Sequence, residues 1–199
     1  MIAPERRPRG RPRQYDPEAA LERATASFWE RGFAGTSLDD LASATGMNRP
    51  SLYAAFGDKR SLFLKTLERY RDQIRAGIKA MLADDPTPAV FLERFYRGAL
   101  DLYTSRGCYW LAAAITDAGT DPEVQAFLAA GMRELDEGLT GLFARAIERN
   151  DICGGTDPAV LGRLATATLQ SLAVRARAGF ARPELDTLAA GAAALLCRR

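Results

Sequence analysis

Apolar residues recur at intervals of three and four along most of the chain, and short polar or glycine-containing breaks separate these runs. Such spacing places apolar side chains on one face of an α-helix. Together with capping and helix-ending residues, it predicts one helix over about 17–31 and two short helices between residues 36 and 57. Six more are predicted over about 59 to the low eighties, 87–104, 107–117, 121–150, 157–179 and 183–197. No alternating run of useful length predicts a strand, so we expect an all-α fold of about nine helices.

The two short helices are the most informative part of the chain. Thr36 or Ser37 can cap the first helix, and Gly46 ends it. Asn48 can cap the second, in which Leu52 points inward. A helix-turn-helix that binds DNA needs a support helix, a tight turn, and short polar side chains early on the exposed face of the second helix. This segment offers all three, although spacing alone also fits a generic three-helix corner.

The residues GMNRPSLYAAFGDKRSLF, preceded by TSLDDLASAT and by the RGF of residues 31–33, favour the first interpretation. This segment resembles the N-terminal domain of TetR/AcrR-family transcriptional repressors. The resemblance is strong over about residues 15–63 and extends to the remainder only in length and helix count. It implies an N-terminal helix-turn-helix domain followed by a C-terminal helical domain that binds an effector and dimerises.

Outward polar positions in the second short helix, taken with this resemblance, give a set of expected DNA contacts. The set is Thr36, Asn48, Arg49, Pro50, Ser51, Tyr53 and Lys59. The chain departs from the family's pattern at Ala54 and Ala55, where bulkier polar or aromatic groups are frequent. Alanine offers no hydrogen bond to a base edge, so the operator sequence cannot be read from this helix.

Positive charge is concentrated in an N-terminal arm. Arginine occupies positions 6, 7, 9, 11 and 13, whereas Glu5 is the one acid among the first thirteen residues. The run Arg9-Gly-Arg11-Pro-Arg13 resembles an AT-hook-like arm, whose arginines enter a narrow minor groove. A basic tail that is merely attracted to phosphates fits the run equally well. We therefore expect a basic arm over residues 1–14, a DNA-binding domain over 15–60, and an effector-binding and dimerisation domain over 61–199.

Composition narrows the function classes. The net charge is only +2, and the chain has no histidine, which excludes a Cys/His zinc site and a Ser/His triad. No HExxH, phosphate-binding glycine loop or paired acid motif supports a helical enzyme, so we expect neither catalysis nor a cofactor. Three widely spaced cysteines favour a reducing compartment, and no apolar run approaches the ~18 residues of a spanning helix. We expect a cytoplasmic protein.

Aromatic residues gather between about residues 87 and 150, more than a simple spacer requires. Aromatic side chains at helical spacing most often form core. The TetR resemblance, however, implies an effector cavity in this region. We expect a small, largely apolar or aromatic effector of unknown identity. The candidate lining residues are Phe91, Phe95, Tyr103, Cys108, Trp110 and Phe127.

Cys108 is a candidate reactive cysteine. It stands at the predicted start of a helix beside Arg106, where backbone amides and a cation could stabilise a thiolate. The Gly-Cys step is similar to one in a subset of the family, some of whose members respond to oxidants or electrophiles. The competing interpretation is an inert, buried cysteine among aromatics.

The last two predicted helices carry apolar stripes with small residues between them. Two such helix pairs, one from each subunit, can form an antiparallel four-helix interface, although the stripes could also pack only within one subunit.

The leading hypothesis is a homodimeric, ligand-responsive repressor that binds a palindromic operator in double-stranded DNA. The alternatives are a constitutive helix-turn-helix protein without a ligand, and an activator.

Overall fold

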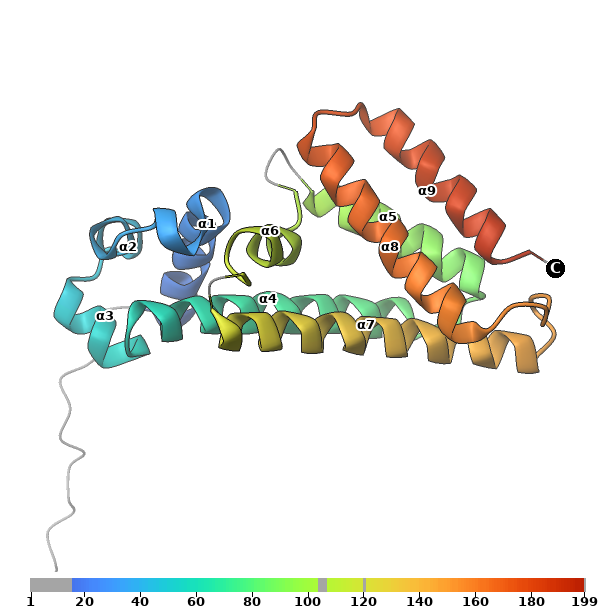
Figure 1. Cartoon of the computed structure of the whole chain (residues 1–199), viewed down its shortest axis with the longest axis horizontal. Helices are drawn as coiled ribbons and strands as arrows, with labels where there is room; N and C mark the ends of the chain where they lie inside the picture. Colours follow the sequence, from blue (N-terminus) through green and yellow to red (C-terminus); the bar gives the residue numbers. More distant parts are fainter. Residues whose placement is uncertain (1–15, 104–106, 120, 199) are drawn as a thin grey trace, which may run out of the picture.

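The computed structural model of the chain describes residues 16–103, 107–119 and 121–198. Across these residues it has nine helices and no strand, which confirms the predicted all-α fold. They are α1 (Pro17–Gly35), α2 (Leu38–Thr45), α3 (Arg49–Phe56), α4 (Lys59–Met81), α5 (Pro88–Leu102), α6 (Tyr109–Thr116), α7 (Pro122–Glu148), α8 (Pro158–Arg177) and α9 (Arg182–Leu196). Figure 1 shows α1 to α3 at one end of the molecule, α8 and α9 at the other, and α4 and α7 running along its length.

Local capping chemistry explains why the helices begin close to the predicted positions. The side chains of Asp16, Asn48, Asp58, Asp121 and Asp157 each accept a hydrogen bond from a backbone N–H in the first turn of the following helix. Such caps satisfy donors that have no partner inside the helix. Because a cap involves only neighbouring residues, it can be read from sequence.

The end of α1 differs from the prediction. Gly32, which follows the predicted end of this helix at about residue 31, adopts φ 70° and kinks the helix, which then continues for one short turn to Gly35. This kink turns Thr36 inward, where its hydroxyl donates to the Gly32 carbonyl at 2.7 Å. Ser37 is therefore the residue that caps α2, in a reciprocal capping box with Asp40.

Two apolar clusters form the core. One joins α5, α7, α8 and α9, and the other lies around the three N-terminal helices. The second cluster continues past the predicted boundary at residue 60, because it includes Phe63 and Tyr70 of α4, Tyr109 of α6, and Val124 of α7. The helices that follow the helix-turn-helix therefore share a core with it.

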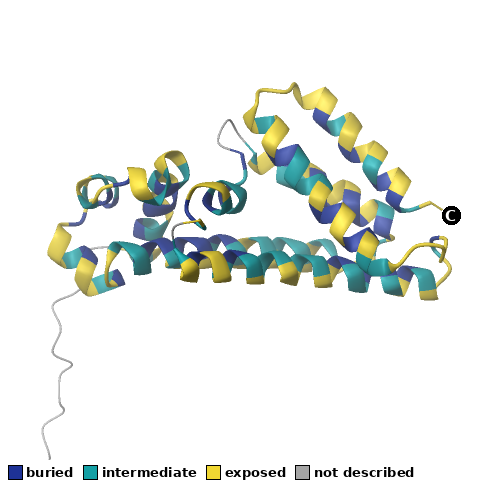
Figure 2. Ribbon diagram, viewed as in Figure 1, coloured by how far each residue is buried: buried dark blue, intermediate teal, exposed yellow. Residues whose placement is uncertain are grey.

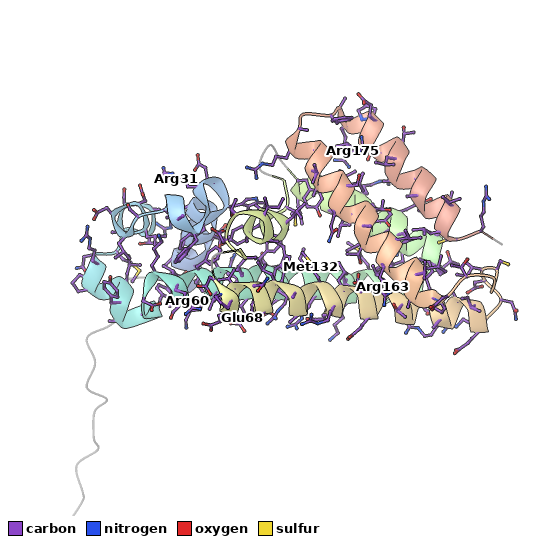
Figure 3. The ribbon with its side chains drawn as sticks, in the orientation of Figure 1. Arg31, Arg60, Glu68, Met132, Arg163 and Arg175 are labelled. Atoms are coloured by element: carbon purple, nitrogen blue, oxygen red, sulfur yellow. The ribbon has the colours of Figure 1, made fainter. Side chains whose placement is uncertain are left out.

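Ion pairs and a close helix crossing fix the long helices. Arg60 of α4, labelled in Figure 3, forms an ion pair at 2.6 Å with Asp121, which caps α7. Further along the same two helices, Arg75 pairs with Glu134. Helix α8 crosses α7 at Gly162, where an added Cβ would stand 2.8 Å from Oγ1 of Thr140. Only glycine allows this approach of α8 to α7 without displacement.

None of the helices in the described segments is both long and apolar enough to cross a membrane.

Candidate DNA interface and ligand cavity

The turn between α2 and α3 depends on Gly46, which ends α2 in the left-handed conformation at φ 70°. Leu52 and Phe56 of α3 are buried and fix its inner face in the N-terminal core. The opposite face, with Arg49, Pro50, Tyr53 and Ala54, is exposed. Helix α3 is thus held from behind by apolar contacts while its front is open, which is the arrangement that a recognition helix requires.

Two of the expected contact residues serve the geometry of α3 as well. The side-chain oxygen of Asn48 accepts from Ser51 N–H at 2.9 Å and caps the helix. Ser51, whose N–H takes part in this cap, is half-buried. Tyr53 is 48% exposed.

Arg49 is held by Asp39 of α2. Its Nε donates to one carboxylate oxygen at 2.9 Å and its Nη2 donates to the other at 2.6 Å. The hydrogen bonds from Arg49 keep the pKa of Asp39 below its ordinary value. Both side chains are exposed, so the pair orients the guanidinium and adds little stability.

Lys59 and Thr36 are less accessible than the sequence suggests. The ammonium of Lys59 lies 4.4 Å above the ring of Phe33, and partial burial lowers its pKa. Thr36 is fully buried, with its hydroxyl donating within α1, so its side chain does not fit the expected phosphate contact. The neighbouring Ser37 is exposed and takes its place as a candidate. Arg9, Arg11 and Arg13 lie outside the described residues.

A cavity of about 1000 Å³ lies between α4, α5, α6, α7 and α8. Its walls are mainly apolar, and Met132 of α7 contributes to them (Figure 3). Five of the six expected effector residues line it, namely Phe91, Phe95, Tyr103, Cys108 and Trp110. Phe127 does not line it. Its ring packs against two side chains that do line the cavity: the Trp110 indole, at 5.5 Å between ring centroids, and the Arg71 guanidinium.

Cys108 lies on the cavity wall between two phenols. The Tyr70 hydroxyl is 3.7 Å from its Sγ, and Tyr103 also contacts the thiol. Burial, with a smaller contribution from Cys108, raises the pKa of both tyrosines well above the ordinary value. Both phenols therefore stay protonated at neutral pH and can donate hydrogen bonds into the cavity. Arg106, which the sequence placed beside this thiol, lies outside the described residues.

The apolar stripes of α8 and α9 face two ways. Leu161, Leu172, Leu185 and Leu196 are buried within the subunit. Five other large apolar residues are between 38% and 61% exposed on the same two helices: Val160, Leu164, Val174, Leu188 and Leu195. Figure 2 shows exposed residues along both helices at this end of the molecule. Each predicted stripe thus contains a face that packs internally and a face without a partner in the described part of the subunit.

Comparisons with known proteins agree with this geometry. Residues 20–66 match the family described as bacterial regulatory proteins, tetR family. A solved structure of the TetR-family regulator CifR, a cysteine mutant complexed with 26-bp double-strand operator DNA, is 32% identical, covers 92% of this chain and 98% of its own, and superposes with a TM-score of 0.84. The chain belongs to the TetR family.

Curated relatives of this TetR-family regulator are also transcriptional regulators. The transcriptional repressor ComR of Escherichia coli is 28% identical over 186 residues, or 91% of this chain and 89% of ComR. The regulator YezE of Bacillus subtilis is 30% identical over 82% of this chain and 87% of its own length. This TetR-family protein is therefore a DNA-binding transcriptional regulator.

Sequence reasoning missed the polar residues at the cavity of this TetR-family regulator. Arg71, Arg75 and Lys79 of α4, Glu134 of α7 and Gln170 of α8 all line it. On a long helix, charged residues at helical spacing read as a solvated face. No signal in a single sequence distinguishes a charge that faces water from one that faces a cavity between helices.

Proposed function

We propose that this regulator is a homodimeric repressor whose cavity binds a small effector and thereby releases operator DNA. The observation that carries the proposal is the cavity of about 1000 Å³, because three of the helices that line it also pack in the core of the helix-turn-helix. These are α4, through Phe63 and Tyr70, α6, through Tyr109, and α7, through Val124. A ligand that moves one of these helices changes the position of α3. Such coupling between sites is typically worth about 1–3 kcal/mol.

In this proposal the chain divides by role at about residue 60. Helix α3 enters the major groove, with Asn48, Arg49, Pro50, Ser51 and Tyr53 toward DNA. Ser37 and Lys59 lie near the phosphates on either side, and Arg9, Arg11 and Arg13 contribute from the arm. Residues 61–199 hold the effector and join the subunits. Since Ala54 and Ala55 donate no hydrogen bond to bases, discrimination depends on Arg49, Ser51, the arm and DNA shape.

The test is selection of bound DNA from a random pool with the full-length protein. The expected product is a palindrome whose half-sites lie about one helical turn apart, because two α3 helices related by a two-fold axis read it. Arg49→Gln removes the guanidinium and its charge while keeping a polar side chain, and is expected to relax selection at one position of each half-site by about 1–3 kcal/mol. A pool without an enriched palindrome contradicts the dimeric mode of reading.

The position of Cys108 supports a second, narrower proposal, that an electrophile entering the cavity alkylates this thiol and weakens DNA binding. N-ethylmaleimide is expected to lower operator affinity in the parent protein and in Cys153→Ser, which removes an exposed thiol elsewhere. It is expected to have no such effect in Cys108→Ser. Cys197 contributes little, since burial raises its pKa to about 11 and keeps it protonated. A response that persists in Cys108→Ser, measured by fluorescence anisotropy of labelled operator, overturns this role.

A further inference from the structure

Arg71 is the most buried charged group among the described residues that line the cavity. It projects from α4, lines the cavity, and its side chain is only 20% exposed. Its guanidinium carbon lies 4.5 Å from the ring centroid of Phe127, which supports one face of the planar group. Its Nε is fully buried and has no hydrogen-bond partner. Its ion-pair contact, with Glu68 one turn earlier, is long at 3.8 Å.

Arg75, in the next turn of α4, differs from Arg71 because its guanidinium has several hydrogen-bond partners. Arg75 donates through Nε and Nη2 to both oxygens of Glu134, and through Nη1 to Asp72 at 3.0 Å. These bonds occupy Glu134, the one acidic residue among the described residues that line the cavity. Arg71, Arg75 and Lys79 thus follow one another at four-residue spacing along α4, and a single carboxylate at the cavity opposes them. The lining carries excess positive charge, and Arg71 is its most buried member.

A buried arginine whose N–H groups are not all hydrogen-bonded, such as Arg71, can still bind an acceptor. The guanidinium carries five N–H donors and stays ionised at any pH that a folded protein tolerates. Withdrawing a cation from water without an acceptor costs free energy, whereas a carboxylate that takes two of its hydrogen bonds recovers that cost. The group that would complete Arg71 is therefore an anion supplied from the cavity.

We propose that the effector is an amphipathic carboxylate, whose anionic head pairs with Arg71 and whose hydrocarbon body lies against Phe91, Phe95 and Leu139. This inference rests on the proposed ligand role of the cavity and names the chemistry of its ligand. Apart from the charged residues of α4 and α7, the polar side chains of the described lining are the protonated phenols of Tyr70 and Tyr103, Cys108, the hydroxyl of Thr166 and the amide of Gln170. A second charge on the ligand beside these groups would be desolvated without a counterion. One head group and an uncharged body fit this distribution.

Three ligands that differ only in the head group test the proposal: decanoate, decan-1-ol and decylamine. A naphthyl set, 2-naphthoate, 2-naphthol and 2-naphthylmethylamine, repeats the comparison with an aromatic body. Titration calorimetry on the full-length protein at neutral pH is expected to show the acid binding about tenfold or more tighter than the alcohol, since hydrogen bonds to a charged group are the stronger ones. The amine is expected to bind weakest.

Three variants assign the preference to Arg71. Arg71→Met keeps an apolar side chain against Phe127 and removes the charge, so it is expected to bind the alcohol as before and to lose the preference for the acid. Arg71→Lys keeps the charge without the planar fork and should retain part of the preference. Lys65→Gln removes one positive charge from an exposed position of α4 outside the cavity lining, and is expected to bind all ligands as the parent does.

The outcomes separate this inference from the proposed function. If the alcohol binds and releases operator DNA while the acid has no advantage, or if Arg71→Met weakens acid and alcohol alike, the head-group assignment is wrong and the ligand-responsive repressor stands. If none of the six compounds binds, both the head group and the ligand role of the cavity fail. An acid preference that disappears in Arg71→Met and persists in Lys65→Gln supports the assignment.

Discussion

Glutamate at both Leu164 and Leu195 is expected to convert the regulator to a monomer and to lower its operator affinity by about a hundredfold or more. These leucines are 49% and 61% exposed on α8 and α9, so neither contributes much to the core of its own subunit. Surface substitutions of this kind usually change the stability of the fold by about 0.5 kcal/mol or less. In a two-fold symmetric interface, however, each substitution occurs twice, and four carboxylates would be buried without partners.

The expected loss of affinity follows from the loss of the second reading head. A dimer places both α3 helices on one DNA, so the second contact forms at a high effective concentration, whereas a monomer binds each half-site separately. Sedimentation equilibrium gives the mass of the variant, and operator titration gives its affinity. Ile115→Glu is the matched control, because Ile115 is 72% exposed on α6 and lies outside the α8 and α9 face. A double variant that remains dimeric would mean that these stripes serve only their own subunit.

The bounds of most helices could be predicted from the sequence, because the interactions that begin a helix involve residues close together in the chain. A cap such as Asp58, whose carboxylate accepts from Ser61 N–H at 2.7 Å, involves residues three positions apart. The choice between Thr36 and Ser37 was not local in this sense, because both can cap a helix. Thr36 turns inward at the kink of Gly32, where the next residue, Phe33, donates from its N–H to the distant Asp117.

The cavity shows the same division between local and tertiary information. Aromatic residues at helical spacing indicated where it lies, and five of six expected residues line it. Trp110 and Phe127 nevertheless have the same pattern in sequence and opposite roles in the structure. Which of them lines the cavity depends on how α6 packs against α7. Gly131 of α7 sets that contact, because it has no side chain to displace the Trp110 indole. The charge of Arg71 was likewise uninformative until the packing of α4 was known.

Helix α6 offers a direct path from the cavity to the DNA-binding helices. Trp110, in its first turn, lines the cavity and donates from Nε1 to the Leu128 carbonyl of α7 at 3.3 Å. Asp117, directly after its last turn, is buried, and its Oδ1 accepts from Phe33 N–H at 3.2 Å, beside the kink in α1. Since α6 has only eight residues, we expect it to move as one short element. A displacement at Trp110 is then expected to reach α1 through Asp117.

Gly131→Ala is expected to produce such a displacement without any ligand and to weaken operator binding about 5- to 150-fold, the usual range of coupling between sites. An alanine Cβ at this position would stand 2.3 Å from Cζ2 of Trp110, so the indole must move away from α7. Tryptophan fluorescence reports the movement, since Trp29 and Trp110 are the only two tryptophans. Gly138→Ala is the control, because it lies on the same helix and lines the same cavity, yet its added Cβ has no neighbour within 4 Å.

Combining Gly131→Ala with Asp117→Ala determines the path. If Asp117 transmits the movement, Gly131→Ala should have little further effect on operator affinity once the carboxylate is removed, and the double-mutant cycle should give a coupling energy well above zero. Equal losses with and without Asp117 would assign transmission to α4 instead, through Phe63 and Tyr70 in the shared core. A shifted Trp110 signal with unchanged operator affinity would exclude α6 as a lever. The first result would make α6 a second connection between cavity and DNA, and an effector that displaces Trp110 could then release the operator without tilting α4.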